Sequence, residues 1–321
     1  MPNSIVVTRG CPYHCNFCYK DAFFKGGKSF YTQTVDEALA EIDRLPDRHL
    51  DFLDDHLLGH QRFARDLFTG MSGMGRVFQG AATVDSILRG DVIETAADAG
   101  LRSIFIGFES LDTANLIQSN KKQNLGKDCG RAIDRLHDLG IMINGSFVFG
   151  LDGDTTEVFR KTVSWTIASG ITTATFHIAT PYPDTAFYKS MASAARLLTH
   201  NWDLYDTRHV VFEPKLISPA ELKSGYDWAY EAFYRWSSII SSSLFHGSAK
   251  HQMKHFFYAG GWKKFEQLWN MLIQLKRLNL MTPLLEAVLS KVSSVNSVKD
   301  PHVVGEHLIA SSNQGHRAHG A

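Results

Sequence analysis

The feature that most constrains the fold of this chain is the alternation of short apolar runs with amphipathic helical segments over residues 1–190. Such an alternation is typical of βαβ units, whose strands pair in parallel. The predicted strands are residues 4–8, 49–53, 76–81, 103–108, 142–149 and 173–179. The predicted helices between them are residues 35–45, 61–68, 86–99, 126–139 and 156–169. Six units are too few to close an eight-stranded barrel, so we expect an α/β fold in the form of an open, partial (β/α)6 barrel.

The pattern changes after residue 190. Residues 219–238 carry aromatic and apolar side chains at helical spacing, which indicates a packed helix rather than a ligand site. Residues 261–278 and 283–292 are predicted as further helices, the second with a proline in its first turn. The polar, histidine-containing end is typical of a disordered tail. We therefore expect a barrel over 1–190, a mainly helical C-terminal extension over 191–292 and a tail over 293–321.

The overall charge of the chain is balanced, with 33 Lys and Arg against 33 Asp and Glu in 321 residues. This balance argues against a nucleic-acid-binding arm and against a general attraction to anionic membranes, and it favours a small-molecule partner. No apolar run approaches the roughly 18 residues of a membrane span. The N-terminus lacks the basic and apolar regions of a signal peptide. We expect a cytoplasmic protein.

The chain has four cysteines, too few for a secreted domain held together by disulfides. Cys11, Cys15 and Cys18 lie within eight positions directly after the first predicted strand, where pairwise bridges would be strained. Clustered thiols in such a context indicate metal binding. Cys129 stands apart at a predicted helix start, where a buried structural thiol is favoured over a fourth ligand.

Two kinds of metal site are compatible with this loop. An iron–sulfur cluster of four irons is usually held by four thiolates, so three cysteines leave one iron open for a ligand from elsewhere. A structural zinc ion takes four protein ligands, and no second Cys or His pair follows at the usual spacing. His14 within the loop and the distant His56 keep a mixed zinc site open as an alternative.

Residues 11–18, Cys-Pro-Tyr-His-Cys-Asn-Phe-Cys, resemble the CxxxCxΦC signature of the radical S-adenosylmethionine (radical SAM) superfamily, with Phe17 in the aromatic position. In that family the loop follows the first strand of a six-unit partial barrel. The resemblance implies that Cys11, Cys15 and Cys18 ligate a [4Fe–4S] cluster whose open iron binds SAM. An electron from a reductant such as a flavodoxin or ferredoxin then yields a 5′-deoxyadenosyl radical, which acts on a small organic substrate.

The resemblance also implies cofactor contacts at the carboxyl ends of the second and fourth predicted strands, where barrel enzymes keep their active sites. Asp54 and Asp55 stand where the family usually has a Gly-Gly-Glu-like motif that meets the methionine amine. Acidic residues at a strand end are also common helix caps. Glu109 and Ser110 are implied contacts to the ribose or the methionine part of SAM.

The end of the fifth predicted strand resembles the family's glycine-rich adenine-side motif, with Ser146 and Gly150 as the implied contacts. We expect Asp154 or Thr155 to cap the helix that follows. The segment 121–124, Lys-Lys-Gln-Asn, is similar to a basic-Gln-Asn segment that many members carry after the fourth strand. It fits a solvated loop equally well.

Three segments resemble the cobalamin-linked branch of the family, which contains hopanoid and other methylases: residues 52–56, 180–185 and 202–214. In the second of these, Asp184 replaces the usual glycine. The resemblance implies possible C-methylation if cobalamin is recruited. Relatives in this branch carry an N-terminal cobalamin-binding domain, which we expect to be absent because the first strand begins within a few residues of Met1. A shortened member, a fragment, and cobalamin bound by a separate chain all remain open.

No catalytic residue is assigned from the sequence. Trp202, Tyr205 and His209 fit either a substrate cavity or packing between the barrel and its extension. Asp54, His56 and Gly59 match a corrinoid-ligand pattern, DxHxxG, which we interpret as coincidence because its companion motifs are absent. The alternatives to a radical SAM enzyme are a zinc-stabilised binding protein and a non-catalytic fragment of a cobalamin-dependent enzyme.

Overall fold

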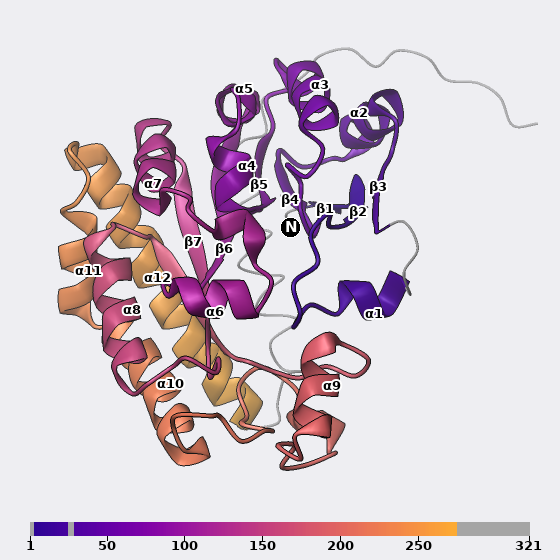
Figure 1. Ribbon diagram of the computed structural model, residues 1–321. Coiled ribbons are helices and arrows are strands. Elements are labelled where there is room, and N and C mark those ends of the chain that lie inside the picture. The colour runs from indigo at the N-terminus through magenta and orange to yellow at the C-terminus, as the bar shows by residue number, and fades with distance from the viewer. Residues whose placement is uncertain (1–2, 25–28, 275–321) are drawn as a thin grey trace, which may run out of the picture. The chain divides into compact units, whose positions relative to one another are not determined.

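The computed structural model describes residues 3–24 and 29–274, and its central feature is one six-stranded parallel sheet (Figure 1). The strands lie side by side in their order along the chain: β1 (Asn3–Ile5), β4 (His49–Phe52), β5 (Val77–Ala82), β6 (Leu101–Glu109), β7 (Met142–Phe149) and β8 (Thr173–Ile178). Every pairing between neighbours is parallel. Among the described residues β1 and β8 do not pair with each other, so the predicted open, partial barrel is confirmed.

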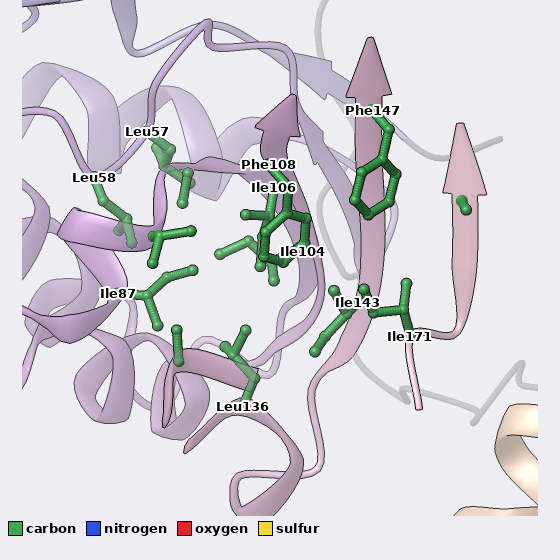
Figure 2. Packing of buried hydrophobic residues seen from close by; sticks show 14 of the residues in the cluster. Leu57, Leu58, Ile87, Ile104, Ile106, Phe108, Leu136, Ile143, Phe147 and Ile171 are labelled. Carbon is green, nitrogen blue, oxygen red and sulfur yellow. The ribbon is translucent and has the colours of Figure 1, made fainter. Parts of the chain in front are cut away.

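Helices connect the strands and cover the sheet. They are α1 (Lys20–Phe24), α2 (Val35–Arg44), α3 (Gln61–Met71), α4 (Val84–Leu88), α5 (Val92–Ala99), α6 (Thr113–Gln118), α7 (Cys129–Asp138), α8 (Glu157–Ala168) and α9 (Ala186–Ser193). Figure 2 shows how Ile104 and Ile106 of β6 and Ile143 of β7 pack toward Ile87 of α4 and Leu136 of α7. This burial of branched apolar side chains drives the sheet and the helices together.

Two predicted elements are divided in the structure. The helix predicted over residues 86–99 is instead α4 and α5, because the chain becomes extended at Arg89 and Gly90 follows with a φ of 63°. The strand predicted over 4–8 ends at Ile5, and Thr8–Gly10 forms a separate strand, β2. β2 pairs antiparallel with β3 (Phe30–Thr32) in a small sheet that we did not predict.

The C-terminal extension is helical, as predicted, with α10 (Pro219–Phe233), α11 (Trp236–Ser243) and α12 (Ala249–Gln274). The single helix predicted over 219–238 is wrong, because the chain becomes extended at Arg235. The helix predicted from residue 261 belongs to the longer α12. Residues 283–292 and 293–321 lie outside the described residues. Residues Met1–Asn270 form one compact unit, so the domain limits at 190 and 292 stay predictions.

Helix α10 protects the outer edge of the sheet. The hydroxyl of Tyr230 donates to the carbonyl of Phe176 at 3.1 Å and accepts from its N–H at 3.1 Å. Tyr234, one turn later, makes the same pair of bonds to Ala174, at 2.9 and 3.2 Å. The two tyrosines thus satisfy groups of β8 that an open edge would leave unpaired. No described helix is both long and apolar enough to cross a membrane.

Candidate functional site

The three clustered cysteines lie in the loop between β2 and α1, beside the carboxyl ends of the central strands. Cys15 is buried, whereas Cys11 and Cys18 are partly exposed, and none forms a disulfide. The N–H of Cys11 donates to the carbonyl of Ser29 at 3.0 Å, and the N–H of Cys18 to that of Cys15 at 3.0 Å. The loop is therefore held in a compact turn that presents three thiols together.

Asn16 ties the middle of this loop to distant parts of the chain. Its N–H donates to the carbonyl of Ser119 at 3.0 Å, and its side-chain amide to the carbonyl of Gln118 at 2.8 Å. Its own carbonyl accepts from the N–H of Phe187 in α9 at 3.0 Å. These bonds connect the loop to the segments that follow β6 and β8, so the loop is clamped from two sides.

The two adjacent carboxylates after β4 hold the ends of the cysteine loop. The carboxylate of the buried Asp54 accepts from the N–H of Thr8. Asp55 accepts from the N–H of Gly10 at 3.0 Å and from the hydroxyl of Tyr19 at 2.8 Å. Burial raises the pKa of Asp54, although its hydrogen bonds act in the opposite direction. The geometry thus gives both residues a positioning contact to the loop, and a contact to SAM stays a prediction.

A buried ion pair lies next to the thiols. The ammonium of Lys121 is 2.6 Å from Oε1 of Glu109, and both side chains are almost entirely buried. Burial alone would lower the pKa of Lys121, but Glu109, Cys15 and Cys11 raise it above its ordinary value. Lys121 therefore remains charged beside the Glu109 carboxylate. A methyl group on Gly107 would lie 2.4 Å from Oε1 of Glu109, so any larger residue there would force the carboxylate to move.

Glu109 reaches this place through an unusual backbone. Its φ of 65° lies in the left-handed region, and the pairing of β6 with β7 shifts register between Gly107 and Glu109. Such strained positions concentrate at functional sites. Ser110 follows, also buried, and its hydroxyl accepts from the N–H of Asp112 at 3.1 Å. The structure thus brings Glu109 and Ser110 to the carboxyl end of β6, as predicted.

Two amide side chains, which follow Lys121 in the chain, also line the site. The amide of Gln123 donates to Sγ of Cys15 over 3.4 Å. The amide of Asn124 donates to the carbonyls of Gly107 and Phe108, at 2.9 and 3.0 Å. Gln123 Oε1 and Asn124 Oδ1 are buried without a partner in the structure, which buried polar atoms rarely are unless a ligand or water meets them. The segment 121–124, interpreted from the sequence as a loop or a family motif, therefore lies against the cysteines.

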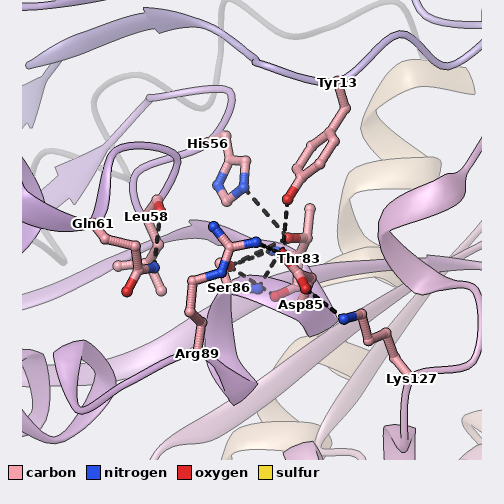
Figure 3. Close-up of polar contacts among 9 residues, drawn as sticks. All are labelled: Tyr13, His56, Leu58, Gln61, Thr83, Asp85, Ser86, Arg89 and Lys127. Atoms are coloured by element: carbon pink, nitrogen blue, oxygen red, sulfur yellow. Dashed lines mark hydrogen bonds and ion pairs between the residues drawn. The ribbon is translucent and has the colours of Figure 1, made fainter.

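Figure 3 shows a second polar cluster, which joins the cysteine loop to the turn after β5. The hydroxyl of Tyr13 donates to Oδ2 of Asp85 at 3.0 Å. The same carboxylate pairs with Arg89 and with the ammonium of Lys127, the latter at 2.8 Å. Burial acts to raise the pKa of Asp85, but its bonds to Lys127, Tyr13 and Arg89 outweigh this and hold the pKa below its usual value. Asp85 is thus a charged anchor for Tyr13.

His56 packs against Tyr13, the side chain that Asp85 holds. Its ring stacks on that of Tyr13 with centroids 5.8 Å apart, and its Nε2 lies 3.3 Å from the hydroxyl of Thr83. Burial lowers the pKa of His56 to about 4, and the Lys121 ammonium acts in the same direction. The imidazole is therefore neutral at ordinary pH.

The loop after β7 is organised by Asp154. Its carboxylate accepts from the N–H groups of Gly150 and Leu151, at 2.9 and 3.0 Å, and from the side-chain amide of Asn115 at 2.7 Å. Our expectation that Asp154 or Thr155 caps the next helix is wrong, because α8 has Thr156 at its N-cap and no side-chain cap bond. Burial raises the pKa of Asp154 to about 6.

The remaining predicted contacts lie within β7, directly after it and beside the cysteine loop. Ser146 is buried in β7, and Gly150 follows the strand directly. Phe17 lines a cavity of about 90 Å³ together with Ser119, Leu151 and Phe187. Phe17 thus lies between the segments that follow β6, β7 and β8.

The segment after β8 packs largely on itself. The hydroxyl of Tyr205 donates to the carbonyl of Thr199 at 2.7 Å, and its ring lies 4.8 Å from that of Trp202. Nδ1 of His209 is 3.0 Å from the carboxylate of Asp206. These contacts favour packing over a substrate cavity.

The turn that begins the segment after β8 contains Asp184. Its φ of 64° lies in the left-handed region, which favours glycine and which aspartate tolerates better than most residues. The geometry explains why similar turns have glycine there.

The three free thiols of one loop are a donor set that suits an iron–sulfur cluster, which thiolates ordinarily hold. Among the residues that the structure describes, no three His, Cys, Asp or Glu side chains are grouped as one metal ion requires. Burial raises the pKa of Cys11 to about 11, and Lys121 opposes this rise. Metal binding would release the thiol protons.

Comparisons with known proteins agree with this geometry. The family model described as the Radical SAM superfamily matches residues 5–166. Bacteriochlorophyllide d C-12(1)-methyltransferase of Chlorobaculum tepidum is 29% identical over 74% of this chain and 52% of its own length. Hopanoid C-2 methylase of Rhodopseudomonas palustris is 24% identical over 61% of this chain and 38% of its own length. The chain thus spans about half, or less, of these curated relatives.

A solved structure shows the same fold. The radical S-adenosylmethionine methyltransferase TsrM from Kitasatospora setae, with cobalamin and a [4Fe–4S] cluster bound, matches with a TM-score of 0.55 and 19% identity. The match covers 70% of this chain and 46% of that one. The resemblance to cobalamin-linked methylases, first drawn from three short segments, is therefore confirmed.

Proposed function

Because this chain belongs to the radical SAM superfamily, we propose that it binds a [4Fe–4S] cluster through Cys11, Cys15 and Cys18 and cleaves SAM reductively. When bound, the cluster supplies the electron that splits SAM into methionine and a 5′-deoxyadenosyl radical. One observation carries the proposal: three free thiols share a loop that the hydrogen bonds of Asn16 clamp to the segments after β6 and β8. A reductant such as a flavodoxin or ferredoxin is the natural electron donor.

The ion pair beside the thiols matches the charges of the ligand. The methionine part of SAM carries both an ammonium and a carboxylate. We assign Glu109 to the ammonium or to the ribose hydroxyls and Lys121 to the carboxylate, since each is buried and ready to exchange its partner for an opposite charge. Ser110 directly follows Glu109 and is buried, so we assign it to the same part of the ligand.

The other proposed contacts divide into binding and positioning roles. Phe17, Ser146 and Gly150 lie around the ends of β7 and the cysteine loop, and we assign them to the adenine side. Asp54 and Asp55 hold the loop backbone, so we assign them first to loop positioning. His56 is neutral and buried, and its ring stacks on that of Tyr13, so we assign it to packing against the cysteine loop.

For the overall reaction we propose C-methylation of a small organic molecule. The support is that matching relatives are named as methyltransferases of bacteriochlorophyllide d and of hopanoids, and that the TsrM structure holds cobalamin. In this proposal the described residues bind the cluster and SAM. Cobalamin would then be bound by another region of the protein or by a separate chain.

Anaerobic reconstitution with iron and sulfide tests the proposal. We expect about four irons per chain, a cluster absorption band, and release of 5′-deoxyadenosine on addition of dithionite and SAM. Cys15→Ala should abolish both signals. Cys129→Ala is the matched control and should retain both, because Cys129 begins α7 and packs at the edge of the core.

The outcomes separate the competing hypotheses. Zinc without iron or labile sulfide would contradict the cluster and support a zinc-stabilised protein. A full cluster without 5′-deoxyadenosine would leave the ligand assignment standing and contradict the catalytic part.

A further inference from the structure

One side chain from outside the cysteine loop donates a hydrogen bond to a sulfur within it. Nε2 of Gln123 lies 3.4 Å from Sγ of Cys15, and both residues are buried. The two residues are 108 positions apart in the sequence. Among the residues that the structure describes, Gln123 is the only one whose side chain donates to a sulfur of this loop.

The other two thiols of the loop receive their hydrogen bonds from the backbone. Burial raises the pKa of the Cys11 thiol to about 11, and a bond from the N–H of Tyr13 opposes this rise. Burial likewise raises the pKa of the Cys18 thiol, and a bond from the N–H of Lys20 opposes it. Each sulfur therefore meets an N–H group. The donor to Cys15 is the one that belongs to a side chain, so a substitution can remove it.

The residues on either side of Gln123 hold it in place. Gln123 is the middle residue of the short 3₁₀ helix η1 (Lys122–Asn124). The amide of Asn124 donates to two carbonyls at the end of β6, and Lys121 is fixed by its ion pair with Glu109. The backbone is thus anchored before and after Gln123, so its amide keeps its position beside the sulfur.

A hydrogen bond to a ligand sulfur acts unequally on the two redox states of an iron–sulfur cluster. The reduced cluster carries one more negative charge, so an N–H group directed at its sulfur stabilises the reduced state more and raises the midpoint potential. A thiolate has no proton to donate, so the N–H of Gln123, and not its oxygen, suits a sulfur that is bound to iron. Among the described residues, Oε1 of Gln123 is buried without a partner.

We propose that Gln123 raises the midpoint potential of the [4Fe–4S] cluster through its hydrogen bond to Cys15, and so makes the cluster easier for its electron donor to reduce. The inference rests on the proposed function, because it requires a cluster on the three thiols. Gln123 acts through Cys15, so it is a positioning residue and not a cluster ligand. Its role belongs to electron transfer, whereas the cysteines hold the metal.

A redox titration of the reconstituted protein without SAM, followed by the EPR signal of the reduced cluster, tests this role. Gln123→Met keeps the length of the side chain and removes the donor. At the midpoint potential of the wild type, its ratio of reduced to oxidised cluster should be about fivefold lower, as the loss of one hydrogen bond predicts. Iron and sulfide content should stay at the level of the wild type.

Two further variants separate the hydrogen bond from other effects of substitution. Gln123→Asn keeps an amide but is one methylene group shorter, so the donor no longer reaches the sulfur and the potential should fall in the same way. The matched control is Gln252→Met, which removes an amide of α12 that donates to the carbonyl of His246 at 2.7 Å. This control should leave the potential unchanged.

The outcomes distinguish this inference from the function on which it rests. A loaded Gln123→Met with the potential of the wild type would overturn the inference and leave the proposed function standing. Loss of the cluster from both Gln123 variants would assign this residue to holding the loop, and an equal fall in Gln252→Met would remove the specific role of the sulfur bond. A wild type that takes up no [4Fe–4S] cluster would overturn the proposed function and this inference together.

Discussion

The ammonium of Lys121 lies 2.6 Å from Oε1 of Glu109, in a place where both side chains are shielded from water. The two residues reach each other from the end of β6 and from the segment that follows α6. Each charge depends on the other, because a lone buried ion is far more costly than a buried pair.

Lys121→Met should therefore lower the free energy of unfolding by about 3–5 kcal/mol, since it leaves the Glu109 carboxylate buried and unpaired. Urea denaturation of the cluster-free protein measures this change. The double variant with Glu109→Gln should recover most of the loss, while SAM cleavage remains absent in both. Equal stability of the single and double variants would show that the pair is not coupled.

Gly107→Ala should disturb the same pair by steric contact. The added methyl group would meet Oε1 of Glu109 at 2.4 Å and the Lys121 ammonium at 3.0 Å. We expect a loss of about 1–3 kcal/mol in unfolding free energy and a weaker affinity for SAM. Gly261→Ala is the control, because nothing lies within 4 Å of its added methyl group in α12. It should stabilise the protein by up to about 1 kcal/mol, so a loss there would contradict the argument.

Asp54→Asn should reduce iron content before it affects SAM binding. Asparagine keeps one acceptor oxygen, so one of the two N–H groups that Asp54 accepts from, those of Val7 and Thr8, loses its partner and the start of the cysteine loop is held less firmly. Iron and sulfide analysis after reconstitution measures the loss, with the exposed Asp66→Asn as control. Full iron content with a weaker SAM affinity would instead support a direct contact between Asp54 and SAM.

Acid should destabilise the protein through its buried histidines. Burial lowers the pKa of His255 to about 3, and His246 and His137 act in the same direction. The unfolded chain has the ordinary value of about 6.5, so it binds protons first and stability is lost as the pH falls below that value. Between pH 7.5 and 5.5, His255 should account for about 1–1.5 kcal/mol of the loss. Denaturation at both pH values should show a smaller loss of unfolding free energy for His255→Gln than for the wild type. The exposed His49→Gln should lose as much as the wild type does.

Tyr234→Phe should weaken the edge of the sheet. The hydroxyl is the partner of both the N–H and the carbonyl of Ala174, and its removal leaves two buried backbone groups unsatisfied. We expect a loss of about 1–3 kcal/mol, measured by thermal or urea unfolding. Tyr188→Phe, on the partly exposed α9, should change little. If Tyr234→Phe leaves the stability unchanged, water has taken the place of the hydroxyl.

The sequence predicted the strands of the sheet well because each is an apolar run of strand length between helical segments. It did not predict β2 and β3, which have three residues each and no periodicity to detect. The break at Arg89 and Gly90 was missed because apolar residues continue on both sides of it, and the backbone angles that end the helix cannot be read from that pattern.

Prediction of the site was limited in another way. The spacing of Cys11, Cys15 and Cys18 identified the centre, since these residues act within one loop. The contact of Gln123 with Cys15 depends on a fold that brings together residues far apart in sequence, so local patterns carry little of it. For Asp154, a helix start nearby suggested a cap, whereas burial and three donors make it the centre of its own loop.

The tie between Asn16 and Phe187 has a consequence for how this protein is made. A ribosome adds about 5–20 residues per second, so the cysteines emerge on the order of ten seconds before the residue that clamps their loop. During that time three reduced thiols meet oxidants and stray metal ions without a finished fold around them. The yield of metal-loaded protein in an expression host should therefore depend on reducing, iron-replete conditions during translation, and not only on the durability of the completed barrel.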